Sequence, residues 1–275
     1  MRATRRLALT KQAGRPHFFN FEILVYLRYW FTLPLIALLA NCLPAAPPDA
    51  PTPVIVELFT SEGCSSCPPA DQLLARLEKA QPVPEAEIIV LGEHVDYWDH
   101  LGWKDRFASH LFTERQQDYA ASLGVEDVYT PQMVVNGQAE LNGADAQRAI
   151  KEIRRAAASP HSSVALLLKN PSELALTVTQ FPAGSKNVEI LLAITEDALA
   201  SDVRKGENAG RQLTHTGVVR SLVSIARLDA RKSPDFTSDL PLRLLDGWNR
   251  QNLDAVVLVT DRGKRRIIGA AKLKL

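Results

Sequence analysis

The sequence predicts an α/β fold in its first half and a mainly antiparallel β fold in its second half. Up to about residue 158, short apolar runs alternate with segments of helical periodicity. From residue 162 onwards, apolar residues tend to recur at every second position between Pro, Gly, Asn and Asp residues. The first 50 residues differ from both parts, so we expect the folded region to begin near residue 54.

Length and charge narrow the classes of partner. The chain has 275 residues, enough for one large domain or two ordinary ones. Its net charge of +1 gives no reason to expect nucleic acid or an anionic membrane surface as a partner. We therefore expect a globular protein whose partners are proteins or small molecules.

Residues 1–42 are predicted to be a signal or export segment. Basic residues as far as Arg15 precede an apolar segment from Ile23 to Leu39, which is the order found in secretory signals. Arg28 and Pro34 interrupt this segment, so it makes a poor permanent membrane span. The alternative is a buried helix of the folded domain.

Cys42 ends the string Leu39-Ala-Asn-Cys, which resembles a bacterial lipoprotein box, although Asn41 stands where a small residue is expected. Cleavage, lipidation at Cys42 and retention of the segment all remain open. Residues 43–53 contain five prolines and predict an extended linker. We expect a periplasmic or otherwise exported protein, attached to a membrane only through its N-terminal segment or a lipid on Cys42.

Three elements are predicted around the loop that contains Cys64 and Cys67. Val54–Phe59 is an almost continuously apolar run, typical of a strand buried on both faces. Glu87–Leu91 predicts a second buried strand. Between them, apolar residues recur at the spacing of a helix that packs on a sheet: Ala70, Leu73, Leu74 and Leu77.

The rest of the first half predicts two more helices and a hairpin. Thr113 and Gln116 form a capping box and Gly124 is a typical helix stop, which predicts a helix over residues 114–123. The following elements are a strand at Met133–Val135, a hairpin turn at Asn136-Gly137, a strand at Ala139–Leu141 and a helix capped by Asp145.

Six strands are predicted beyond Pro160, and they suggest a mainly antiparallel, sandwich-like arrangement. They are Val164–Leu168, Leu174–Phe181, Val188–Ile194, Gly217–Leu228, Ala255–Thr260 and Ile267–Leu273. The change of periodicity predicts two domains, residues 54–158 and residues 162–275, with a boundary near 157–163.

The string Cys64-Ser-Ser-Cys67 lies between a predicted buried strand and a predicted amphipathic helix. If Cys42 is removed or lipidated, an oxidising compartment leaves these two thiols only each other as partners. A helix N-terminus stabilises a nearby thiolate, so Cys64 is predicted to attack and Cys67 to resolve the mixed disulfide. Pro68-Pro69 favours a helix that begins at Pro68, which places Cys64 further from its N-terminus.

A second motif, Tyr129-Thr130-Pro131, directly precedes the strand and hairpin that follow it. A buried strand ending in CxxC, then a Thr-Pro that opens a hairpin, then a last helix, resembles the thioredoxin superfamily. In that superfamily the proline is cis and packs against the disulfide, and the backbone beside it pairs with an extended substrate. The resemblance implies these roles for Pro131 and Thr130.

Several longer strings resemble one family within that superfamily, known as DUF1223. They are Glu57–Asp71, His94–Asp99, Gly102–Asp105, Tyr129–Val135 and Gly206–Arg211, with His215 and Val218–Arg220 beyond them. The resemblance covers residues 53–275. It implies an exported bacterial thioredoxin-like protein of undefined activity, and therefore a fold without a substrate.

Two groups near the cysteines have alternative interpretations. Glu57 stands seven residues before Cys64, near where thioredoxins place a buried acid that shuttles the resolving cysteine's proton. The alternative is a strand-end glutamate that faces water. His94, Asp96 and Asp99 follow the second strand, where they either bind copper or zinc together with the cysteines or hydrogen-bond the loop of Tyr97 and Trp98.

In the second half, Arg211, His215 and Arg220 form either an anion or peptide site or a lock between the two predicted domains. For the whole chain we expect an exported thiol–disulfide oxidoreductase without a cofactor. Its partners would be exported protein thiols or disulfides, small disulfides or a redox partner. Two alternatives stay open, a copper- or zinc-handling module that uses Cys64, Cys67 and His94, and a binding module with a structural disulfide.

Overall fold

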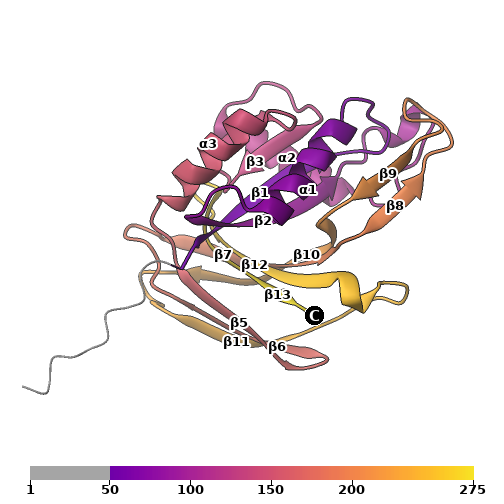
Figure 1. Cartoon of the computed structure of the whole chain (residues 1–275). Helices are drawn as coiled ribbons and strands as arrows, with labels where there is room; N and C mark the ends of the chain where they lie inside the picture. Colours follow the sequence, from indigo (N-terminus) through magenta and orange to yellow (C-terminus); the bar gives the residue numbers. More distant parts are fainter. Residues whose placement is uncertain (1–49) are drawn as a thin grey trace, which may run out of the picture. The chain divides into compact units, whose positions relative to one another are not determined.

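An eight-stranded sheet runs through both halves of the chain, with helices on its first half (Figure 1). The computed structural model describes residues 50–275. The predicted export segment, Cys42 and most of the linker 43–53 lie outside the described residues. Within residues 50–275, no helix is both long and apolar enough to cross a membrane.

The first half has the predicted order of elements. They are β1 (Thr52–Thr60), α1 (Pro68–Ala80), β2 (Ala86–His94), the short 3-10 helix η2 (Asp99–Leu101), α2 (His110–Leu123), β3 (Gln132–Val135), β4 (Ala139–Asn142) and α3 (Ala146–Ala157). β1 pairs in parallel with β2 and antiparallel with β3. The four apolar residues predicted to face the sheet from α1 are all buried.

Helix α2 begins four residues earlier than predicted, because Ser109 rather than Thr113 is its N-cap. The predicted capping box was wrong because tertiary contacts occupy both of its side chains. The Thr113 hydroxyl donates a hydrogen bond to the Asp96 carboxylate (2.6 Å), and the Gln116 amide donates to a backbone carbonyl of another loop (2.7 Å). Gly124 does end the helix, with a φ of 71° that suits glycine.

The hairpin and the last helix of the first half are confirmed. Asn136 and Gly137 both have positive φ, 47° and 62°, as a tight two-residue hairpin turn requires. Asp145 caps α3 by accepting a hydrogen bond from the Arg148 N–H (3.0 Å). The first strand of this hairpin, β3, follows Pro131 directly and pairs antiparallel with β1.

The second half contains all six predicted strands and three that were not predicted, β8, β9 and β11. Its elements are β5 (Ser163–Asn170), β6 (Glu173–Thr179), β7 (Asn187–Glu196), β8 (Leu199–Asp202), β9 (Gln212–His215), β10 (Val218–Asp229), β11 (Phe236–Pro241), the 3-10 helix η3 (Arg250–Asn252), β12 (Leu253–Asp261) and β13 (Arg266–Lys274). The three unpredicted strands are short and contain few apolar residues.

The two halves share one sheet, with strand order β13-β12-β7-β10-β2-β1-β3-β4. The link is the parallel pairing of Val218 with Gly92, where the Gly92 N–H donates to the Gly217 carbonyl (2.8 Å). The boundary predicted near residues 157–163 falls between α3 and β5, and both halves lie within one compact unit.

Three apolar layers hold the sheet in place. The first lies between β1, β2 and the helices α1 and α3, and the second joins β1 and α2 to β7 and β12. In the third, the small sheet β11-β6-β5 packs on β7 and β12 through residues such as Leu176, Ile190 and Val257. The candidate cysteine site therefore stands on strands that are buried from both sides.

Candidate functional site

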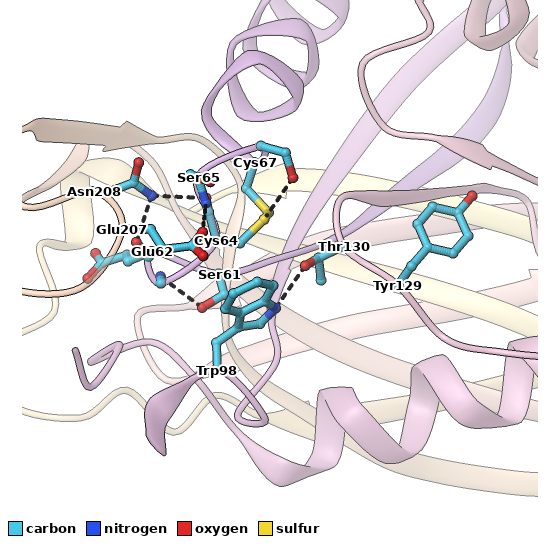
Figure 2. The surroundings of a disulfide bond; sticks show 12 residues. Ser61, Glu62, Cys64, Ser65, Cys67, Trp98, Tyr129, Thr130, Glu207 and Asn208 are labelled. Atoms are coloured by element: carbon cyan, nitrogen blue, oxygen red, sulfur yellow. Dashed lines mark hydrogen bonds between the residues drawn. A yellow bond between two sulfur atoms is a disulfide. The ribbon is translucent and has the colours of Figure 1, made fainter. Parts of the chain in front are cut away.

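The two cysteines lie between the end of β1 and the start of α1 (Figure 2). Cys64 and Cys67 form a disulfide with a Cα–Cα distance of 5.4 Å. Helix α1 begins at Pro68 as predicted, and Cys67 is its N-cap, so Cys64 lies one turn before the helix. Both cysteines are fully buried, whereas Ser65 and Ser66 between them are exposed. The Ser66 hydroxyl lies 3.3 Å from Cys64 Sγ.

Thr130 and Pro131 approach the same region from the start of β3. The Thr130–Pro131 peptide bond is cis, as the resemblance implied. A Cβ added to Gly143 would lie 3.0 Å from the Cβ atoms of both Ala70 and Pro131, so Pro131 and the first turn of α1 both lie beside Gly143. Trp98 Nε1 donates a hydrogen bond to Thr130 Oγ1 (2.8 Å), and Figure 2 shows this pair near the disulfide.

A loop of the second half holds the cysteine turn in place. Asn208, which is fully buried, donates from Nδ2 to the carbonyls of both Glu62 and Cys64 (2.9 Å each). The Glu207 carboxylate accepts a hydrogen bond from the Ser65 N–H (3.0 Å), as Figure 2 shows. Arg211 in turn donates to Asn208 Oδ1 (3.1 Å), which supports the interpretation of this region as a lock between the halves.

Four buried ionisable side chains lie together beside this turn, and we call them the acid–base cluster: Glu62, His94, Asp105 and His215. His94 Nδ1 is 2.6 Å from Asp105 Oδ2, which also accepts the Glu62 N–H (2.9 Å). His215 Nε2 is 3.2 Å from Glu62 Oε1, and the two imidazole rings meet edge to face at 4.8 Å. Trp103 Nε1 donates to Glu62 Oε2 (2.7 Å).

The pKa shifts in the cluster follow these contacts. Burial acts against the charge of His94, but the carboxylate of Asp105 outweighs it and raises the His94 pKa. Burial is likewise outweighed at Asp105, whose pKa is lowered by the His94 charge, and at Glu62, whose pKa is lowered by its hydrogen bond to His215. On the neighbouring helix, burial raises the pKa of Asp71.

The metal-binding alternative finds no support in this geometry. Both cysteines are in the disulfide, and His94 is paired with Asp105. In the part of the chain that the structure describes, no group of three or more His, Cys, Asp or Glu residues is arranged to hold a metal ion. The Asp96 N–H donates to Thr113 Oγ1 of α2 (3.2 Å), and the Thr113 hydroxyl donates back to the Asp96 carboxylate (2.6 Å), in agreement with the alternative that these residues order the loop.

Glu57 neither faces water nor lies on the face of the sheet that carries α1. It is fully buried, so the water-facing alternative was wrong. Side chains alternate along a strand, and Val56 and Leu58 pack toward α1, so Glu57 points to the opposite face of the sheet. There it accepts hydrogen bonds from Arg115 Nε (2.6 Å) and the Tyr119 hydroxyl (2.7 Å) of α2. Proton transfer to Cys67 is therefore not supported for Glu57.

The same arginine contacts a second buried acid, Glu93. Arg115 Nε is 3.3 Å from Glu93 Oε1, and neither carboxylate oxygen of Glu93 has a hydrogen-bond partner within residues 50–275. Burial, together with the negative charge of Glu57, outweighs the attraction of Arg115 and holds the pKa of Glu93 well above its usual range. Glu93 thus favours its protonated form in the folded chain.

Replacing Glu93 by glutamine should stabilise the protein at neutral pH. Because the folded pKa lies above the unfolded value, Glu93 contributes most stability at low pH and loses it as pH rises toward the folded pKa. Glutamine copies the neutral acid without this loss, so we expect a gain of about 1–3 kcal/mol at pH 7 that shrinks on acidification. Urea unfolding of the wild type and the Glu93→Gln variant across the pH range measures this gain. A loss of stability at pH 7 would contradict the protonated form of Glu93.

Sequence reasoning singled out His94 and His215 but not Glu62, Asp105 or Asn208. All five residues lie in the strings that carry the family resemblance. That shared membership was the available signal, since no local pattern distinguishes a buried ion pair whose partners are far apart in the chain.

Comparison with known proteins identifies a family and a related structure. The model of the family described as "Protein of unknown function (DUF1223)" matches residues 55–260. The crystal structure of protein AGR_C_4864 from Agrobacterium tumefaciens is 27% identical, covers 82% of this chain and 95% of its own, and has a TM-score of 0.66.

A domain of the outer membrane lipoprotein Omp28 from Porphyromonas gingivalis is 13% identical and covers 42% of this chain and 94% of its own. The TM-score of this match is 0.24. None of the curated proteins is significantly similar to the chain. The family match spans most of residues 50–275, and the chain belongs to the DUF1223 family.

Proposed function

We propose that the protein is an exported thiol–disulfide oxidoreductase whose first half is thioredoxin-like and whose redox group is the Cys64–Cys67 disulfide. The observation that carries the proposal is the position of this disulfide, between a buried strand and the start of a helix, with Pro131 and the helix's first turn both beside Gly143. The order of elements from β1 to α3 supports the same assignment. Export rests on the N-terminal sequence.

The proposed reaction is a reversible exchange with a protein or small-molecule dithiol. A substrate thiolate attacks Cys64 Sγ, the Cys64–Cys67 bond breaks, and its electron pair goes to Cys67 Sγ. The second substrate thiol then loses its proton and attacks the substrate sulfur of the mixed disulfide, which releases Cys64. The substrate ends as a disulfide and the protein as a dithiol, and the reverse direction reduces a substrate disulfide.

Access to the sulfur sets a condition on this reaction. Both cysteines are fully buried, and the Ser65-Ser66 turn between them is exposed. The turn is held from outside by the exposed hydrogen bond from the Ser65 N–H to Glu207. Exchange therefore requires this turn to move aside, and the Glu207 contact is the one that water competes for.

The burial of both sulfurs also favours a second candidate, a binding module in which the disulfide is structural. The midpoint potential of the Cys64–Cys67 pair separates the two. A value above about −250 mV is expected for a pair that exchanges electrons with partners, and a value below about −300 mV is typical of structural disulfides. We expect the first result in glutathione buffers with folded protein. The second result would contradict the oxidoreductase.

A further inference from the structure

We propose that a pocket between α2 and the second half of the chain binds a small molecule that carries a phosphate group. The pocket has a volume of about 390 Å³ and lies where α2 meets one end of β7, β10 and β12. It shares no residue with the cysteine site, so the inference goes beyond the proposed redox function and does not depend on it. Three features support it: four arginines, an excess of positive charge, and a buried hydroxyl without a partner.

The four arginines come from three separate places in the chain. Arg115 belongs to α2, Arg227 to β10, and Arg262 and Arg265 to the turn between β12 and β13. A guanidinium group presents several N–H donors in a planar fork that matches the oxygens of phosphate and carboxylate groups. Guanidinium groups that the fold brings from distant segments to one cavity point to an anionic ligand.

The sheet holds part of the pocket in a fixed arrangement (Figure 1). Glu189 of β7 is paired with Arg227 of β10 on one side and with Thr260 of β12 on the other. Side chains of paired residues lie on the same face of a sheet, so these three form a row across the strands. Leu191 and Tyr119 supply the apolar part of the pocket and belong to the layer between α2 and the sheet.

Two of the arginines share one carboxylate. Arg227 Nε lies 2.8 Å from Glu189 Oε1, and Arg262 Nε lies 3.5 Å from Glu189 Oε2. Burial acts against the charge of Glu189, but hydrogen bonds from Ser224 and Arg227 outweigh it and lower the Glu189 pKa. Glu189 is therefore charged at neutral pH, and its one negative charge faces two positive ones.

The other two arginines have one charged carboxylate each. Arg115 Nε donates to Glu57, and Arg265 Nη1 lies 2.7 Å from Asp118 Oδ2. Glu93 also contacts Arg115, but it favours its protonated form and adds no charge. Four arginines thus meet three charged carboxylates in the ion pairs of the described residues, and a bound anion would neutralise the excess.

Thr260 contributes a hydroxyl that lacks a partner. Its Oγ1 is buried and makes no hydrogen bond within residues 50–275, although Thr260 lines the pocket. A buried polar atom without a partner is costly and uncommon, so it calls for an explanation. An oxygen of a ligand in the pocket would supply the missing partner.

A phosphate ester suits these donors better than a carboxylate does. A carboxylate has two oxygens in one plane, which one guanidinium fork can occupy. A phosphate ester has three acceptor oxygens and a charge of about −1.5 to −2 at pH 7, so it can accept from several guanidinium groups at once. The volume lies in the range of small-molecule sites, about 300–1,000 Å³, which leaves room beside Leu191 and Tyr119 for the organic part of the ester.

The test is isothermal titration calorimetry of the full chain with inorganic phosphate and with glycerol phosphate at low ionic strength, where screening is weak. We expect one saturable site for both, with the ester bound at least as tightly. Sodium acetate at the same ionic strength should show no saturable binding. Acetate that binds as tightly as the two phosphates would overturn the assignment of a phosphate ligand.

Replacing Arg227 and Arg262 together by methionine should weaken the binding of glycerol phosphate about tenfold or more, the effect of losing a hydrogen bond to a charged group. Their side chains are 61% and 48% exposed, so the variant should still fold, which circular dichroism checks. The matched control is Arg231→Met, because Arg231 is an exposed arginine paired with Asp229 outside the pocket and should leave binding unchanged.

Thr260→Val separates a binding role from a structural one. Valine keeps the shape of threonine and removes the buried hydroxyl, so the ligand-free variant should be at least as stable in urea as the wild type. Its binding of glycerol phosphate should nevertheless weaken about threefold, the effect of a typical hydrogen bond. A wild type that binds neither phosphate, or a folded double-arginine variant that binds glycerol phosphate as the wild type does, would overturn the inference.

Discussion

Replacing Cys64 by serine should abolish thiol–disulfide exchange, whereas replacing Cys67 by serine should stop the reaction at a covalent intermediate. Cys64 lies before the helix with its sulfur next to the exposed Ser66, so it is the sulfur that a partner reaches first once the turn opens. A serine there forms no mixed disulfide. A serine at position 67 leaves the mixed disulfide without a resolving thiol, so partners accumulate on Cys64.

Non-reducing gels and mass spectrometry of the two variants, produced with their export segment, measure this asymmetry. Ser65→Ala is the matched control, because it changes the same turn without removing a sulfur and should keep near-normal exchange with dithiothreitol and a model protein disulfide. Partners trapped equally by both cysteine variants, or exchange that survives Cys64→Ser, would contradict the assigned roles. Captured partners would also reveal the direction of electron flow.

Much of the first half could be predicted because its signals are local. The helical spacing from Ala70 to Leu77, the Asn136-Gly137 turn and the Asp145 cap each depend on residues within one or two turns of the chain. The capping box at Thr113 failed for the opposite reason. The Thr113 hydroxyl donates its hydrogen bond to Asp96, which lies 17 positions away in the sequence. No local pattern predicts that contact.

The candidate site was likewise predicted where its signals are local and missed where its contacts are long-range. The CxxC motif and the Thr130-Pro131 step are short strings with a characteristic context, so they were found. The pairing of Glu62 with His215 spans 153 positions and depends on β9 lying against the cysteine turn. Within the sheet, the two halves are joined by a single pair, Val218 with Gly92, and the Gly217 Cβ position, 2.7 Å from the Val90 carbonyl oxygen, admits only glycine. Periodicity carries no information about such a contact.

Replacing Arg115 by methionine should cost about 3–5 kcal/mol of stability, the typical loss when one partner of a buried ion pair is removed. Arg115 is the cation that Glu57 and Glu93 share, and both carboxylates are fully buried. Methionine fills similar volume but leaves the Glu57 carboxylate in an apolar layer, where the Tyr119 hydroxyl is its remaining donor within residues 50–275. The free energy of unfolding in urea at pH 7 measures the effect.

Two comparisons show whether charge, and not packing, causes that loss. Arg265→Met removes an exposed pair with Asp118 and should cost less than about 1 kcal/mol, because surface pairs contribute little. Adding Glu57→Gln to the Arg115→Met variant removes the stranded charge of Glu57 and should restore part of the stability. If the double variant is no more stable than the single one, the layer between α2 and the sheet is held by its apolar contacts, and neutralisation of Glu57 by the arginine does not contribute.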